Sequence, residues 1–203
     1  MKTQTPAYTV IDLKSFYASV ECVERGLDPF EANLVVADAS RGEGSVCLAV
    51  SPALKALGVK NRCRLFEIPK NIKYIIAPPR MQFYIDYAAK IYGIYLKYVA
   101  KEDIYVYSID EAFLDVTGAR RRMGSPVTIG RWIRAEIRRR VGVPASVGIA
   151  STKFIAKLAS SHAKPDGLLL VPAASTQDFL NVLPVGALWG VGTRTQEVLA
   201  RWG

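Results

Sequence analysis

The sequence has few of the residues from which disulfide frameworks and zinc sites are built. Of its 203 residues, three are cysteines (Cys22, Cys47 and Cys63) and one is a histidine, His162. The cysteines are odd in number, widely spaced and not accompanied by a histidine cluster, so they predict buried thiols and no zinc site. A single histidine cannot form a paired metal site, and we interpret His162 as structural.

Long apolar runs are missing as well. No stretch approaches the roughly 20 apolar residues that a membrane-spanning helix requires. The first six residues also lack the apolar segment of a secretory signal. These absences predict a cytoplasmic protein.

The chain is instead rich in apolar residues spread along its length and in positive charge. Half of the residues are hydrophobic, enough to bury the core of one large domain or two small ones. The 27 Lys and Arg residues exceed the 18 Asp and Glu residues, which gives a formal net charge of +9. Such a charge favours a polyanionic partner, either a nucleic acid or an anionic membrane, but charge alone does not choose between them.

The hydrophobic pattern predicts strands and helices in a mixed order. Residues 8–11 form a β-rich run that ends at Asp12, and residues 15–24 have apolar side chains at helical spacing. A short helix at 51–58 is indicated by a capping serine, a first-turn proline and a terminal glycine. The other expected elements are strands at 34–37, 46–50, 104–109, 112–116 and 146–150 and helices at 81–96, 128–141 and 152–162.

This order predicts an α+β fold in which an antiparallel sheet is backed by helices. Residues 25–78 interrupt the order between the first helix and the long second one, as a small inserted subdomain would. From residue 168 the pattern changes to a short strand, a helix and a pair of glycines before a last helical segment. A chain that ends there, at a helical hairpin, looks truncated.

Three acids stand where predicted strands end or bend. Asp12 closes the first strand, and Asp110 and Glu111 lie at the bend between two β-rich runs. If these strands are neighbours, the three carboxylates converge on one edge of the sheet. Oxygen ligands suit Mg²⁺, and two such ions would support phosphoryl or nucleotidyl transfer. The alternative interpretation is that they are ordinary solvated residues at turns.

Four sequence motifs bear on this choice. The motifs at residues 10–21, 107–115, 148–153 and 163–167 resemble, in order and spacing, those of the UmuC/DinB-type Y family of lesion-bypass DNA polymerases. The helix-hairpin-helix-like segment at 188–192 and residues 56–60 add to the resemblance, which spans nearly the whole chain.

The resemblance implies a right-hand polymerase fold with a ferredoxin-like palm. Residues 1–24 and 79–167 would form the palm, residues 25–78 the inserted fingers, and residues 168–203 the start of a helical thumb. The family's little finger, a separate module that clamps DNA, would be absent.

The resemblance also implies a reaction. Asp12, Asp110 and Glu111 would bind two Mg²⁺ ions, with Mn²⁺ as a substitute, and the carbonyl of Leu13 would supply a further metal ligand. The primer 3′-hydroxyl would attack the α-phosphate of a deoxynucleoside triphosphate. The implied partners are primed DNA and, by analogy with the family, a sliding clamp, a recombinase filament or an accessory subunit of a bacterial damage response.

Three further residues match nucleotide-binding positions of the family. Tyr17 matches the steric gate that lies under the sugar and excludes a ribose 2′-hydroxyl, and Phe16 beside it would support the same pocket. Lys164 matches a lysine that meets the triphosphate. Core aromatics and a solvated lysine are the alternative interpretations.

The inserted segment departs from the family pattern. Many relatives hold the triphosphate with a tyrosine and an arginine on the short helix, but Ser51 and Leu54 are assigned to those positions here. Ser51 is either a phosphate ligand or a helix cap, and Lys55 or Arg41 could compensate for the missing arginine.

The glycine turn of the last segment adds a DNA contact to these expectations. The backbone amides at Gly190 and Gly192 are expected to grip a DNA phosphate without reading its sequence, with a simple turn as the alternative. Two other functions remain open: a nucleotide cyclase on a related palm, and a non-catalytic DNA-binding or interaction module.

Overall fold

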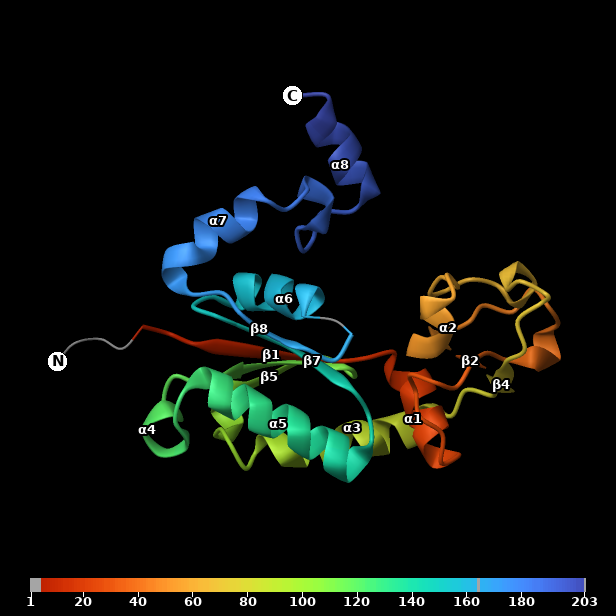
Figure 1. The fold of residues 1–203 in the computed structure, drawn as a ribbon, viewed down its shortest axis with the longest axis horizontal. Helices are drawn as coiled ribbons and strands as arrows, with labels where there is room; N and C mark the ends of the chain where they lie inside the picture. Colours follow the sequence, from red (N-terminus) through yellow and green to blue (C-terminus); the bar gives the residue numbers. More distant parts are fainter. Residues whose placement is uncertain (1–4, 164, 203) are drawn as a thin grey trace.

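A computed structural model describes residues 5–163 and 165–202 (Figure 1). Its larger sheet has five strands in the order β5-β6-β1-β7-β8. The central strand β1 pairs antiparallel with both β6 and β7, and β8 joins β7 in parallel, so the sheet is mixed at one edge. The strands are β1 (Tyr8–Leu13), β5 (Ile104–Ser108), β6 (Glu111–Asp115), β7 (Ala145–Ala150) and β8 (Leu168–Leu170).

Helices cover both faces of this sheet because its strands are apolar on both sides. Neighbouring residues of β1 enter different cores: Ile11 packs with α3 and α5, whereas Val10 packs with α6. Figure 1 shows α3 and α5 on one side of the sheet and α6 on the other. The helices are α1 (Phe16–Glu24), α3 (Met81–Tyr95), α4 (Arg120–Met123), α5 (Pro126–Val141) and α6 (Lys153–His162).

Helix α5 begins two residues before the predicted start at 128. Ser125 is its N-cap, with an Oγ that accepts a hydrogen bond from the Thr128 amide, and Pro126 occupies the first turn. The positive φ of Gly142 ends the helix at the other side.

The inserted segment forms a second, smaller sheet with its own core. Its strands lie in the order β3-β2-β4, with bounds β2 (Leu34–Val36), β3 (Ala49–Val50) and β4 (Ile75–Ala77), beside the short helix α2 (Pro52–Ala56). Of the strand predicted at 46–50, residues 49–50 pair as β3. The rest changes partner, because the Cys47 amide bonds to the Cys63 carbonyl while the Leu48 amide bonds to the Val36 carbonyl.

The C-terminal segment is attached to the larger sheet through aromatic side chains. It contains α7 (Thr176–Asn181) and α8 (Thr193–Ala200). Between them, the Trp189 ring lies 5.5 Å from that of Tyr107 and 5.8 Å from that of Phe113, measured between ring centroids. Short 3₁₀ turns complete the chain at Ala39–Arg41, Leu65–Glu67, Lys101–Asp103, Ala173–Ser175 and Val185–Ala187.

Several expectations about single residues are met. All three cysteines are buried and free. His162 has a structural place, with a ring nitrogen 2.9 Å from the Leu158 carbonyl oxygen and an edge-on contact with Phe179. Within residues 5–163 and 165–202, none of the helices has the length and apolar character needed to cross a bilayer.

Helix α6 lies unusually close to β7, and Gly148 permits this approach. A Cβ atom at residue 148 would lie 2.0 Å from the Ala156 carbonyl oxygen and 2.2 Å from the Ser160 amide nitrogen. Both neighbours are backbone atoms, so no side chain can rotate away to make room. The close approach therefore requires glycine at this position.

We expect Gly148→Ala to lower the free energy of unfolding by roughly 3 kcal/mol, because the methyl group forces α6 away from the sheet. Gly93→Ala is the matched control, since Gly93 lies within α3 with open space around it; alanine there is expected to stabilise the helix by about 1 kcal/mol. Urea unfolding of both variants measures the difference. Equal stability of the two variants would contradict this account of the packing.

Candidate active site

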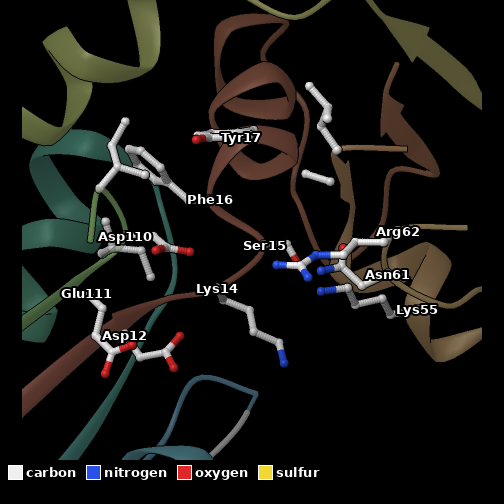
Figure 2. Close-up of a pocket in the computed structure, with 14 residues that line it drawn as sticks. Asp12, Lys14, Ser15, Phe16, Tyr17, Lys55, Asn61, Arg62, Asp110 and Glu111 are labelled. Carbon is white, nitrogen blue, oxygen red and sulfur yellow. The ribbon is translucent and has the colours of Figure 1, made fainter. Parts of the chain in front are cut away.

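A cavity of about 390 Å³ lies between the edge of the larger sheet and the inserted sheet. Asp12, Asp110 and Glu111 come from the larger sheet, and Lys55 and Arg62 enter from the inserted segment opposite (Figure 2). One wall of the cavity is therefore acidic and the other basic. This arrangement suits an anionic ligand whose negative charge faces the basic wall and which shares a bound cation with the acidic wall.

The pairing of β1 with β6 brings the acids together. Asp12 lies directly opposite Glu111 in the antiparallel register, and the Leu13 amide donates a 2.8 Å hydrogen bond to the Asp110 carbonyl oxygen. The three residues lie at one edge of the sheet, as predicted, and line the same cavity.

Lys157 of α6 lies beside two of these acids. Its Nζ is 2.8 Å from Glu111 Oε2 and 3.3 Å from Asp12 Oδ2, and all three side chains are largely buried. Burial would lower the pKa of Lys157, but the bond to Glu111 and the charge of Asp12 raise it above its usual value. The lysine is therefore charged and offsets the repulsion between the carboxylates.

Glu111 retains a raised pKa in spite of that lysine. Burial raises its pKa most, Lys157 lowers it, and the charges of Asp12 and Asp110 raise it further. Its second oxygen, Oε1, is buried and has no hydrogen-bond partner within the described part of the chain. A buried carboxylate oxygen without a partner is a position at which a cation would be favourable.

Asp110 is turned differently from the other two acids. Its Oδ1 accepts a 2.6 Å hydrogen bond from Ser108 Oγ, and Figure 2 shows its carboxylate apart from those of Asp12 and Glu111. As they stand, no three His, Cys, Asp or Glu side chains in 5–163 and 165–202 are grouped around one point. The all-oxygen donor set and the unpartnered Glu111 Oε1 fit Mg²⁺, provided that the Asp110 side chain rotates.

Tyr17 lies in the same cavity on the first turn of α1. Its ring stacks on that of Tyr84 in α3, with 4.4 Å between centroids and 15° between planes. Burial and the charge of Asp110 raise the pKa of the Tyr17 hydroxyl, which keeps it protonated. Phe16 is buried in the core beside Tyr17 and also lines the cavity, so both the pocket and the core interpretation of this residue stay open.

The model of the impB/mucB/samB family matches residues 11–161, well over half of the chain. The chain belongs to this family. It is 37% identical over 194 residues to DNA polymerase IV of Desulfatibacillum aliphaticivorans, covering 95% of this chain and 48% of that protein. It is 34% identical over 198 residues to the putative UV-damage repair protein UvrX of Bacillus subtilis, covering 95% and 46%. The chain thus spans about half the length of the curated relatives it matches.

Solved structures of Y-family polymerases share the fold. An insertion ternary complex of Dbh DNA polymerase matches with a TM-score of 0.86 and 27% identity over 97% of this chain and 58% of that chain. DinB from Sulfolobus solfataricus matches with a TM-score of 0.82 and 29% identity, covering 97% and 57%. The predicted α+β fold, a polymerase palm with a helix-backed sheet, is confirmed.

Ser51 and Leu54 do not line the cavity. Ser51 is fully buried as the N-cap of α2, and its Oγ accepts hydrogen bonds from the amides of Leu34 and Leu54. Leu54 is buried in the core of the inserted sheet. The cap interpretation of Ser51 is confirmed, and this placement gives no support to a contact between Ser51 and a nucleotide.

Lys55, the next residue along α2, lines the cavity instead. The assignment of family positions to Ser51 and Leu54 had pointed to the buried side of this short helix. Arg41 borders a neighbouring cavity and pairs with Asp38 at 3.1 Å. Lys55 therefore suits the role of the missing arginine better than Arg41 does.

Three expected residues remain: Lys164, Gly190 and Gly192. Lys164 falls outside the described residues. Gly190 has a φ of 89° in the turn before α8, and Gly192 is the N-cap residue of that helix. A DNA contact at these glycines stays a prediction.

Lys157 was missed at the level of sequence, because a helix with two lysines among its apolar residues resembles any helix with a solvated face. The available signal was positional. The helix follows directly after the strand at 146–150. If that strand pairs with the first strand, which carries Asp12, a lysine on the helix lies close to Asp12.

A buried carboxylate on α1, that of Glu21, holds Tyr84, the residue on which Tyr17 stacks. Glu21 is fully buried and accepts hydrogen bonds from Arg80 Nε at 2.9 Å, Arg80 Nη2 at 2.8 Å and the Tyr84 hydroxyl at 2.8 Å. It also pairs with Arg25. Burial would raise the pKa of Glu21, but the bonds from Arg80, Arg25 and Tyr84 lower it below its usual value of 4.5.

We expect Glu21→Gln to lower the free energy of unfolding by about 2 kcal/mol at pH 7, less than for a fully buried pair because both arginines keep contact with water. Since the folded pKa of Glu21 is depressed, its contribution is complete above pH 4.5 and is lost as the pH falls through the folded value. Urea unfolding at pH 7 and at steps toward pH 3 should show the difference from wild type shrinking. A difference that stays constant with pH would show that the charge of Glu21 is not its cause.

Proposed function

We propose that the chain carries the catalytic centre of a template-directed, lesion-bypass DNA polymerase. The reaction joins a deoxynucleoside triphosphate to a primer 3′-hydroxyl and releases pyrophosphate. The observation that carries this proposal is the cavity with three carboxylates on one wall and basic side chains on the other. The relatives named DNA polymerase IV and the ternary complex of Dbh support it.

The parts of the hand follow the two sheets. We assign residues 1–24 and 79–167 to the palm, residues 25–78 to the fingers and residues 168–203 to the start of the thumb. The separate hydrophobic cores of the larger and inserted sheets support this division. The cavity then lies between palm and fingers, where a nucleotide would be enclosed from two sides.

Asp12, Asp110, Glu111 and the carbonyl of Leu13 would hold two Mg²⁺ ions, or Mn²⁺ in their place. When bound, such ions lower the charge of the phosphates and stabilise the attacking and leaving oxygens. The protein's own contribution is to hold the carboxylates at the sheet edge through the register of β1 and β6. Lys157 offsets the charge of Asp12 and Glu111 while the cations are absent.

The other cavity residues would orient the nucleotide. Lys55 offers a positive charge to the phosphates. The N-terminus of α1 faces the same space, and its first amides have no hydrogen-bond acceptor within the helix. The Tyr17 ring, held by its stacking on Tyr84, would lie against the sugar. Lys164 retains its proposed role at the triphosphate.

Primed DNA is the proposed macromolecular substrate, in keeping with the formal charge of +9. Backbone amides at Gly190 and Gly192 are proposed to hold a DNA phosphate. A sliding clamp, a recombinase filament or an accessory subunit in the bacterial cytoplasm is proposed by family analogy. A non-catalytic DNA-binding module is the second candidate, favoured by the hydrogen bond that engages Asp110 with Ser108 and by the separation of its carboxylate from the other two.

We expect Asp110→Asn to reduce primer extension by at least about 1,000-fold, because the amide cannot replace a charged metal ligand. The assay uses excess protein over primed DNA with Mg²⁺ or Mn²⁺, for the chain alone and joined to the remaining half of a matched relative. Asp86→Asn, an exposed acid on α3, is the matched control and should extend normally. If neither wild-type form extends the primer yet both bind DNA, the non-catalytic candidate is correct.

We expect Tyr17→Ala to reduce discrimination against ribonucleotides by on the order of 100-fold, because the space left by the ring admits a 2′-hydroxyl. Tyr17→Phe keeps the ring and should keep the discrimination. Single-nucleotide insertion kinetics with matched ribo- and deoxyribonucleotides measure both variants. Unchanged discrimination in Tyr17→Ala would rule out this residue as the gate.

A further inference from the structure

Two residues other than glycine have a positive φ within 5–163 and 165–202: Ser15, at 49°, and Arg62, at 61°. This left-handed conformation is unfavourable for a residue with a Cβ atom. Both residues line the cavity of the proposed active site, one from each wall (Figure 2). Unfavourable backbone conformations persist where the surroundings impose them, and they gather at functional sites.

The surroundings of Arg62 explain how its conformation is held. Val59 and Cys63 are buried in the core of the inserted sheet on either side of it. The Cys63 carbonyl accepts the Cys47 amide at 2.8 Å, and Arg64 Nη1 donates to the Gly44 carbonyl at 2.7 Å. The turn at Arg62 is thus fixed at both ends, and its exposed side chain reaches into the cavity.

The Arg62 guanidinium is available to a ligand. Within the described residues, no carboxylate lies at ion-pair distance from it, although other arginines of the chain pair with Asp28, Asp38, Glu21 or Glu136. It extends toward Ser15, whose Oγ is buried and lacks a hydrogen-bond partner in the same part of the chain. A ligand with several acceptor oxygens would satisfy both groups.

Neighbouring groups select phosphate oxygens as the partner. Lys55 enters the cavity from the same wall as Arg62, and the amides of the first turn of the nine-residue helix α1 face it from the other. Two cationic side chains and a helix N-terminus together favour a polyanion over a neutral base or sugar.

We propose that Arg62 binds the phosphate chain of the incoming nucleotide, with its guanidinium donating to phosphate oxygens that Ser15 Oγ also contacts. This inference rests on the proposed function. Arg62 lies outside the sequence motifs on which the resemblance to the polymerase family depends. It also explains why a residue with a side chain is kept in a turn that glycine would occupy more easily.

Binding of inorganic pyrophosphate tests the inference without requiring catalysis. In calorimetric titrations with Mg²⁺ present, Arg62→Ala should weaken pyrophosphate binding by on the order of 10–100-fold, and Arg62→Lys should restore part of the loss. Lys60→Ala removes an exposed charge from the same loop outside the cavity and is the matched control, with binding within about twofold of wild type. Measurable binding that is unaltered in Arg62→Ala would overturn the proposal, as would no detectable binding by wild type.

Stability and kinetics add independent readouts. Arg62→Gly should raise Tm by about 2–4 °C while losing the same affinity as Arg62→Ala, because glycine adopts the positive φ without strain. In primer extension, Arg62→Ala should raise the KM for the nucleotide with little change in kcat.

The kinetic outcomes separate failure of this inference from failure of the proposed function. A raised KM with unchanged pyrophosphate inhibition would place Arg62 at the base or sugar and overturn the inference while leaving the polymerase intact. Arg62-dependent pyrophosphate binding by a wild-type chain that extends no primer, either alone or joined to the remaining half of a relative, would support the phosphate site and refute the polymerase.

Discussion

Repulsion between carboxylates at one edge of a sheet is the constraint around which this structure is organised. Asp12 and Glu111 face each other across β1 and β6, and Lys157 lies within 3.3 Å of both. The lysine reaches them because α6 lies against β7. Their separation is so small that position 148 has no room for a Cβ atom. One glycine in a strand is therefore coupled, through a helix, to the charge balance of the cavity.

A second buried charge joins the two chain segments between which the small sheet is inserted. Glu21 precedes the insertion and Arg80 follows it, so their ion pair joins the two chain segments from which the small sheet extends. Tyr84 donates to the same carboxylate and stacks on Tyr17. The shape of the cavity and the position of the proposed gate thus depend on one network, which lies beneath the surface that a nucleotide would contact.

The outline of the fold and the acidic wall were accessible from sequence, whereas the basic wall was accessible only in part, with Lys55 as one of two alternatives. Strand ends at Asp12 and at the 110–111 bend are local features, and local periodicity identifies them. Which face of the short helix α2 meets the cavity depends on how the inserted core packs, and Lys55 rather than Ser51 or Leu54 proved to line it. The parallel pairing of β8 likewise depends on a contact between distant segments.

The sequence by itself determined most of the helices and strands, the family resemblance and the three acids, because hydrophobic period, capping residues and motif spacing are properties of neighbouring residues. The tertiary structure alone decided that Lys157 lies between two carboxylates and that Arg62 turns into the cavity. These are distances between side chains far apart in the chain or backbone angles imposed by packing. Burial and long-range contacts determine these distances and angles, and a local sequence pattern contains no information about either.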